Sequence, residues 1–304
     1  IGWVLAGAAP FLLMRDFARR FCFAHLIVGR ALLLDGAVAA LTIPSLALLA
    51  WYGHLSVTSA FATMGAASAV CSFGWYYLSR RAFSRSFRQI GTTTSRNWQM
   101  GKWFLSGQLA EQAQGYLTPW LAFAIAGAAV TGVYAACSSI VAFTNPLLFG
   151  FFNVLLPKFV LTLREQGVAA LRRQACADAA LLAGIMGAFT FVVFVFGDDI
   201  MDLLYGSKSY AGYGHVLVVI AAAALVGAVA APASIALAAA ERANIAAYVT
   251  ALTALLSVGL IAALLVYWGL LGAVYGVLGA EIFGCISLWL AFFVLVPNAS
   301  STAG

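Results

Sequence analysis

Charged residues are scarce in this sequence. Asp, Glu, Lys and Arg make up only 9% of the 304 residues, whereas hydrophobic residues make up 64%. A soluble domain is usually about 25% charged. The 16 basic and 10 acidic side chains therefore cannot cover the surface of a water-soluble protein of this length. We infer that the lipid bilayer is the solvent for most of the chain.

Cysteine and histidine are also few, and they are scattered. The five cysteines show no metal-binding spacing, and the three histidines lie in separate segments at His25, His54 and His215. We therefore expect free thiols and neither a metal nor another cofactor. The chain lacks a large outer loop or an interfacial cluster of acids and histidines. A membrane-bound polysaccharide polymerase or glycosyltransferase usually needs one of these, so we expect no enzyme.

Long runs without charge are abundant. Residues 36–79, 112–157 and 243–280 contain no Asp, Glu, Lys or Arg. One membrane-spanning helix needs about 20 apolar residues, so the first two runs each hold two spans. Backbone groups in hydrocarbon must bond within the segment, which makes these spans helical.

The pattern predicts an all-α, polytopic membrane helical bundle with nine spans. The predicted spans are 1–14 (truncated at its start), 31–53, 57–79, 103–126, 131–156, 174–196, 214–238, 244–267 and 270–296.

The basic residues alternate between loops in a way that sets the orientation. Segments 15–30, 80–102 and 158–173, together with Arg242, carry 15 of the 16 Lys and Arg residues. Loops rich in Lys and Arg stay in the cytoplasm, so the acidic loop 197–213 is predicted to face outward. The net charge of +6 therefore reflects topology and contact with anionic membrane lipids. We expect no nucleic-acid partner.

A weak internal repeat divides the chain. Ala8-Ala9-Pro10 and Ala230-Ala231-Pro232 are each followed by a basic turn, a span, a very short outer loop and another span. Transporters are often built from such repeats. The repeat predicts a protein of about twelve spans, of which this chain holds nine. Four segments follow: 1–79, the remainder of an N-terminal lobe with three spans; 80–102, a cytoplasmic inter-lobe linker; 103–296, a C-terminal lobe of six spans; and 297–304, a tail.

Several motifs, taken in order, carry a family resemblance. Gly101-Lys102-Trp103-Phe104-Leu105 with Gln108, Gln112 and Pro119-Trp120 resembles the seventh span of bacterial polysaccharide (O-antigen type) flippases. The next span continues the resemblance with Gly132-Val133-Tyr134-Ala135-Ala136, Asn145-Pro146-Leu147-Leu148, Asn153 and Leu155-Leu156-Pro157-Lys158. These flippases belong to the superfamily of multidrug, oligosaccharidyl-lipid and polysaccharide exporters.

The resemblance implies a fold and a substrate. The expected fold is two six-helix lobes in an inverted V around a central cavity that opens alternately to each side. The expected substrate is an undecaprenyl-pyrophosphate-linked oligosaccharide, flipped across the bacterial inner membrane for surface polysaccharide biosynthesis. Polysaccharide polymerase and glycosyltransferase machinery would be partners. A drug or metabolite exporter of the same superfamily is the alternative.

Glu111 is the leading site candidate because a charge within the membrane is costly. It lies nine residues after Lys102, about 13 Å into its helix. Its polar and small neighbours should face the substrate cavity, and the resemblance adds two asparagines. The predicted cavity residues are Gln108, Glu111, Gln112, Gly115, Pro119, Asn145 and Asn153. Glu111 and Glu281 are the candidates for proton or sodium coupling, with a structural role as interhelical polar contacts left open.

A pyrophosphate needs cations. The candidate head-group residues lie at the predicted cytoplasmic mouths of spans: Arg30, Arg80, Lys102, Lys158 and Arg242. The alternative is that these residues only flank spans and set topology.

Overall fold

Every regular secondary-structure element in the parts that the structure describes is an α-helix. The computed structural model describes residues 2–25, 27–80, 90–206 and 212–296. The helices form two compact units, Ile1–Ile90 (unit 1) and Gly91–Gly304 (unit 2). The all-α membrane bundle predicted from the sequence is confirmed.

Unit 1 contains three helices: α1 (Gly2–Ala24), α2 (Val28–Trp51) and α3 (Val57–Ser79), which all contact one another. Helix α3 begins at a capping box, in which the Ser56 hydroxyl accepts from the Ser59 backbone N–H and Ser59 reciprocates. Such a box satisfies backbone donors that a helix start leaves free. Trp75 of α3 packs against the rings of Phe17 and Phe21 of α1, at centroid distances of 6.2 and 5.4 Å.

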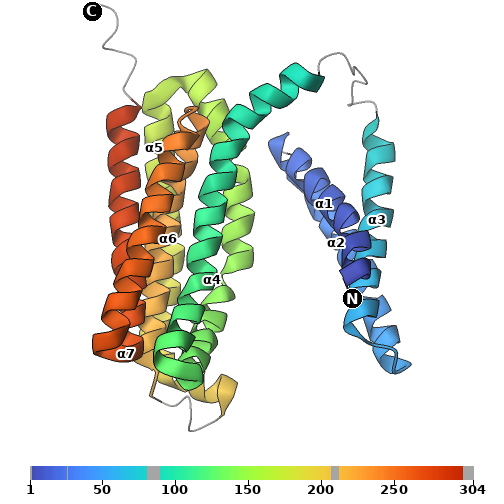
Figure 1. Cartoon of the computed structure of the whole chain (residues 1–304). Helices are drawn as coiled ribbons and strands as arrows, with labels where there is room; N and C mark the ends of the chain where they lie inside the picture. Colours follow the sequence, from blue (N-terminus) through green and yellow to red (C-terminus); the bar gives the residue numbers. More distant parts are fainter. Residues whose placement is uncertain (1, 26, 81–89, 207–211, 297–304) are drawn as a thin grey trace, which may run out of the picture. The chain divides into compact units, whose positions relative to one another are not determined.

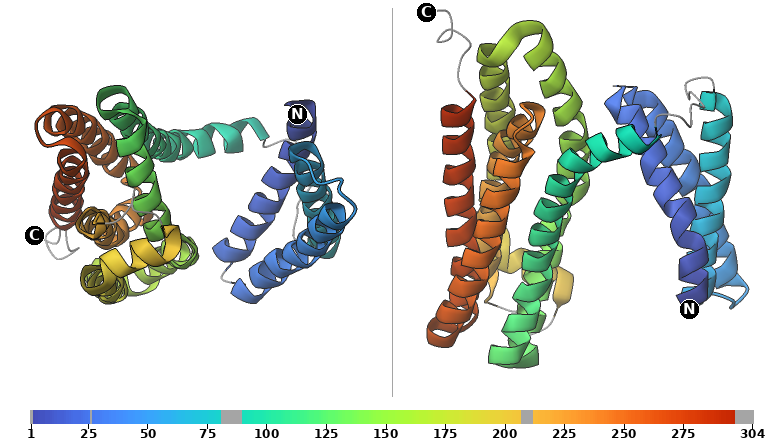
Figure 2. Two further views of the ribbon diagram at one scale, coloured as in Figure 1. Left: turned by 90° about the horizontal axis from the view of Figure 1, so that it is seen from below. Right: turned by 45° about the horizontal axis from the view of Figure 1, so that its top comes forward.

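Unit 2 contains α4 (Ile90–Ala142), α5 (Asn145–Tyr205), α6 (Gly214–Ala239) and α7 (Ala243–Leu295). Three of these helices turn back on themselves at a glycine, as Figures 1 and 2 show: α4 at Gly127, α5 at Gly167 and α7 at Gly269. Each of these glycines has a positive φ, of 84°, 80° and 60° respectively. Glycine adopts this conformation without steric cost, so one residue suffices to join two antiparallel arms.

Six helices, namely α2 to α7, are long and apolar enough to cross a membrane. The glycine turns at Gly127, Gly167 and Gly269 divide α4, α5 and α7, and each turn falls between two predicted spans. Three differences stand out. Helix α4 begins at Ile90, inside the predicted linker 80–102; α5 continues to Tyr205, inside the predicted loop 197–213; and Phe143 and Thr144 interrupt the predicted span 131–156. Residues 81–89, 207–211 and the predicted tail 297–304 lie outside the described residues.

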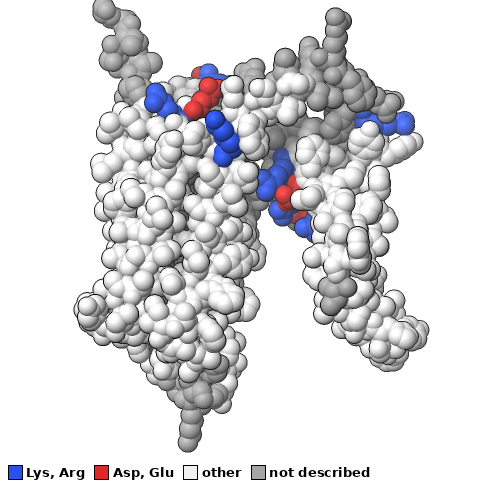
Figure 3. All heavy atoms as spheres, viewed as in Figure 1, with Lys and Arg blue, Asp and Glu red and all other residues white. Residues whose placement is uncertain are grey.

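On the face that Figure 3 shows, the charged side chains of unit 2 gather at one end, and the other described residues of unit 2 on that face are uncharged. We call this the basic end of unit 2; it holds the turn at Gly167 and the α6–α7 turn with Glu241 and Arg242. At this end the Arg172 guanidinium donates hydrogen bonds to the carbonyl oxygens of Phe293 and Val296, at 2.7 and 2.6 Å. The first carbonyl belongs to the last turn of α7 and the second to the residue that caps it, where no further helical donors are available.

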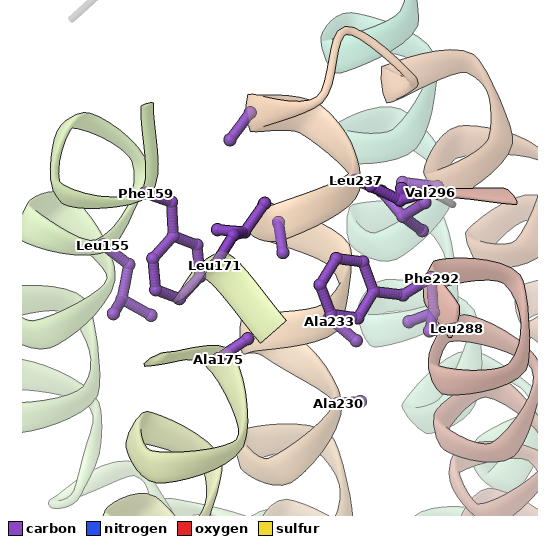
Figure 4. Close-up of a cluster of buried hydrophobic side chains, with 13 residues drawn as sticks. Leu155, Phe159, Leu171, Ala175, Ala230, Ala233, Leu237, Leu288, Phe292 and Val296 are labelled. Atoms are coloured by element: carbon purple, nitrogen blue, oxygen red, sulfur yellow. The ribbon is translucent and has the colours of Figure 1, made fainter. Parts of the chain in front are cut away.

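The core of unit 2 lies where α5 and α7 pack on α6. Figure 4 shows Phe159 of α5 and Phe292 of α7 directed towards α6, where Ala233 leaves space for them. All three residues are 0% exposed. Because lipid tails are as apolar as these side chains, van der Waals packing stabilises the contact, and the alanines of α6 allow the helices to approach closely, as small residues do in membrane bundles.

The two arms of α7 meet along a row of glycines. A Cβ atom at Gly276 would lie 2.9 Å from the backbone nitrogen of Ile261, and one at Gly284 would lie 2.7 Å from the Thr253 hydroxyl. A Cβ at Gly272 would collide with the backbone carbonyl of Leu264. The hairpin therefore depends on backbone-to-backbone contact that no other residue permits.

Gly276→Ala should destabilise unit 2 by about 1–3 kcal/mol, because the added methyl overpacks a contact made by backbone atoms. Gly259→Ala in the same helix is the matched control, since a Cβ there meets nothing within 4 Å. Alanine should favour the helix at that control position by up to about 1 kcal/mol. Unfolding in SDS, followed by circular dichroism, measures both; equal stability of the two variants would contradict the close packing.

Candidate functional site

One face of the first arm of α4 carries the polar residues that point into unit 2. Gly107, Glu111, Gln114 and Thr118 follow one another at spacings of four, three and four, which places them on one helix face. Gly107 lies close to Ala247 of α7: a Cβ atom added at Gly107 would be 3.7 Å from the Ala247 Cα. Thr118 is 2% exposed, and its hydroxyl donates to the Gln114 carbonyl oxygen at 2.9 Å.

Glu281 of α7 is held by this face. The Gln114 side-chain amide donates to Glu281 Oε1 at 3.1 Å. Gly227 of α6 lies on another side of the carboxyl group, where a Cβ would come within 3.4 Å of Oε2. Glu281 therefore lies at a junction of α4, α6 and α7.

A second carboxyl group lies nearby. The Gln108 amide nitrogen is 3.5 Å from Glu111 Oε2, and Glu111 lies about one helical turn before Gln114, the residue that donates to Glu281. Two carboxylates in a membrane interior are strongly unfavourable unless a proton or cation compensates them. The pair can thus bind a proton or a small cation, which is the chemistry of ion coupling.

Buried hydroxyl groups lie on the neighbouring arm of α7. Thr253 and Ser257 are 7% and 0% exposed, and their hydroxyls have no hydrogen-bond partner in the described part of the chain. The Thr253 hydroxyl faces Gly284, about one helical turn from Glu281. Across the described ranges, no three His, Cys, Asp or Glu side chains converge, so a cation would need amide or hydroxyl oxygens beside the carboxylates.

Glu111 and Gln108 also line a pocket of about 330 Å³. Its walls come from all four helices of unit 2 and are mostly apolar, with Ser234 and Thr250 as further polar groups. A second pocket of about 580 Å³ adjoins it, because Phe104, Leu156 and Ala238 line both. We call the two together the unit 2 groove; it runs from Glu111 to the basic end.

The structure brings together some of the predicted cavity residues. Gln108 and Glu111 line the same pocket. Gln112 and Gly115 are exposed and lie on another face of α4, and Pro119 lines a separate apolar hollow with Trp120. Asn145 is exposed at the start of α5, and Asn153 is half-buried on the same helix. None of these last five residues contributes to the lining of the groove.

The predicted head-group residues differ in their surroundings. Lys158 pairs with Asp178 at 3.1 Å across the α5 turn, and Gln174 donates to the same carboxylate. Arg80 lies over the Tyr77 ring at 4.4 Å, and Lys102 lies 5.2 Å from the Trp103 ring centroid. Arg30 is exposed, and Arg242 lies at the rim of the groove.

Sequence reasoning missed Gln114, Thr253 and Ser257. Gln114 follows Glu111 by three positions, a spacing that could have placed it on the same face. Thr253 and Ser257 carried no such signal; Thr253, for example, faces Gly284 on the other arm of α7, 31 positions along the sequence.

Comparisons with known proteins support the fold and go no further. No protein-family model matches the chain, and no curated protein matches its sequence. Solved structures of MATE transporters do match its fold. A MATE transporter in the straight conformation superposes with a TM-score of 0.84 at 15% identity, covering 95% of this chain and 67% of the other.

Two further solved structures also match the fold of this chain. The MATE transporter VcmN of Vibrio cholerae in its bent form gives a TM-score of 0.78 at 15% identity, with 95% and 67% coverage. A MOP superfamily transporter from Pyrococcus furiosus gives 0.77 at 17% identity, with 94% and 68% coverage. This chain therefore has the fold of the MATE transporters over about two thirds of their length.

Proposed function

We propose that this chain belongs to a flippase that moves undecaprenyl-pyrophosphate-linked oligosaccharide across the bacterial inner membrane by alternating access. The shared fold with membrane transporters supports the transport class. The ordered motifs from Gly101 to Lys158, which resemble the polysaccharide flippases, support the substrate. We further propose that unit 1 is the remainder of the N-terminal lobe and unit 2 is the C-terminal lobe.

The observation that carries the transport mechanism is the Gln114–Glu281 contact at the junction of α4, α6 and α7, with the exposed Glu111 about one helical turn away on the lining of the groove. Glu281 and Glu111 take up a proton or sodium ion, and binding shifts the packing of α4 against α6 and α7 through the Gln114–Glu281 hydrogen bond. A ligand can bias a conformational equilibrium only by binding one state better. The junction of three helices at Glu281 offers such a state-dependent site.

The glycan and its pyrophosphate use other groups. Gln108 is proposed to bond sugar hydroxyls, and the predicted positions Gln112, Gly115, Pro119, Asn145 and Asn153 remain proposals for the cavity wall. Arg30, Arg80, Lys102 and Arg242, which make no ion pair among the described residues, are proposed to receive the pyrophosphate. Lys158 is the weakest of the predicted set because Asp178 already neutralises it.

Export of a drug or metabolite is the second candidate function. One of the matching structures, at TM-score 0.78 and 17% identity, is an outward-facing multidrug resistance MATE transporter of the MOP superfamily. The mostly apolar groove beside Glu111 could also receive an apolar cation, because a carboxylate within apolar walls suits a lipophilic amine.

Deletion of the gene separates the two functions. A flippase mutant should accumulate lipid-linked oligosaccharide in the inner leaflet and lose surface glycan, with complementation restoring both. An exporter mutant should keep normal surface glycan and become more sensitive to toxic cations. Normal glycan together with normal levels of the lipid-linked intermediate would contradict the flippase proposal.

A further inference from the structure

The groove of unit 2 has a feature that transport of a glycan does not use. Its upper part, towards the basic end, is lined by apolar side chains from α4, α5 and α7, including Phe104, Val160, Leu163 and Leu295. Water gains few hydrogen bonds in such a space. The walls therefore favour a hydrocarbon chain over water or a sugar.

The rim of the groove carries charge. Arg164 and Arg242 lie at the basic end, and Glu241 lies beside Arg242. The guanidinium groups of both arginines have no ion-pair partner within the described ranges of the chain. Two arginines and one glutamate leave one net positive charge at the rim, which a single phosphodiester would neutralise.

The length of the groove matches one leaflet of a bilayer. Along α5 the lining runs from Arg164 at the rim to Phe152 at the deep end. The twelve steps between these two residues span about 18 Å at 1.5 Å per residue. One leaflet contributes about 15 Å of hydrocarbon, so an extended acyl chain with its phosphate at the rim would reach the level of Gln108 and Glu111.

We propose that the unit 2 groove binds one anionic glycerophospholipid of the inner leaflet. Its phosphodiester lies between Arg164 and Arg242, and one acyl chain extends along Leu163 and Leu156 towards Glu111. The lipid keeps water away from the acidic pair on that side, so its presence controls access of protons or ions from the basic end. Lipid binding needs only the groove and a bilayer, whereas control of ion access rests on the proposed coupling role of Glu111 and Glu281. The lipid would compete with the pyrophosphate for Arg242.

Native mass spectrometry of the full chain, released from nanodiscs of mixed phosphatidylglycerol and phosphatidylcholine, tests the proposal. The wild-type protein should retain one phosphatidylglycerol in preference to phosphatidylcholine. The double variant Arg164→Ala/Arg242→Ala should weaken that retention by about thirtyfold, as expected for two interfacial arginines. Arg173→Ala is the matched control: Arg173 is an exposed basic residue of the same end that does not line the groove, and retention should not change.

A second variant tests the acyl chain. Leu163→Trp narrows the groove just inside its rim and should reduce retention of phosphatidylglycerol, while thermal unfolding confirms that the protein is folded. Equal retention of both lipids, or retention that neither variant changes, would overturn the proposal. So would retention of undecaprenyl pyrophosphate alone that depends on the two arginines, since it would assign the groove to the flippase substrate.

Discussion

Glu281→Gln should strongly reduce ion-driven transport while leaving the fold intact. Glutamine keeps an oxygen that can accept the hydrogen bond from Gln114, at 3.1 Å in the native protein, but it can neither bind a proton nor compensate a cation. Coupling free energies between sites are typically 1–3 kcal/mol, so we expect a loss of about 5- to 150-fold. The measurement is substrate transfer in proteoliposomes under an imposed proton or sodium gradient.

This variant separates coupling from structure. If Glu281 serves only as a polar contact between helices, glutamine would preserve that contact and transport would stay near the native rate. Glu165→Gln is the control, because Glu165 is exposed on α5 and lines neither pocket. Full transport by Glu281→Gln under a gradient, with the control equally active, would remove Glu281 from the mechanism. Glu111→Gln should reduce transport in the same direction.

Asp178→Ala should be among the most destabilising single changes in unit 2. Asp178 is 5% exposed and accepts from both Lys158 and Gln174. Removing it leaves an ammonium and an amide without their acceptor across the α5 turn. Loss of one partner of a buried pair costs about 3–5 kcal/mol. Because the Lys158 side chain is 40% exposed, the low end, about 3 kcal/mol, is expected in SDS unfolding.

The double variant Lys158→Met/Asp178→Leu is the control for this interpretation. Replacing both charges by apolar groups of similar size is often close to neutral, so stability should recover most of the loss. If the double variant is as unstable as Asp178→Ala, the packing around Asp178 rather than its charge pairing stabilises the turn.

The sequence predicted the helices well because one physical rule governs them. Charge-free runs of sufficient length must be helical spans in a bilayer, and the short glycine-containing connections marked the hairpins. The turns at Gly127 and Gly269 fall in the predicted gaps between spans. Helix ends were less accurate: Ile90 and Tyr205 lie in segments whose polarity predicted loops, because a helix can continue into the interface where water satisfies its side chains.

The site was only partly predictable. Glu111 and Glu281 were each identified separately, because a charge within a membrane span is costly. Their proximity, and the Gln114–Glu281 bond across 167 positions, depend on how α4 packs on α7, which no local pattern encodes. The Lys158–Asp178 pair could have been found, because the two residues lie almost symmetrically about the turn at Gly167.

Transfer of the proposed substrate tests the flippase assignment most directly. The full protein is reconstituted into liposomes that carry a fluorescent undecaprenyl-pyrophosphate-linked oligosaccharide, and a membrane-impermeant glycosidase reports which leaflet exposes the glycan. With an ion gradient, the native protein should move the glycan between leaflets, and Glu281→Gln should do so much more slowly. No transfer of the lipid-linked glycan, together with gradient-driven uptake of a lipophilic cation by the same vesicles, would contradict the flippase assignment and favour the exporter.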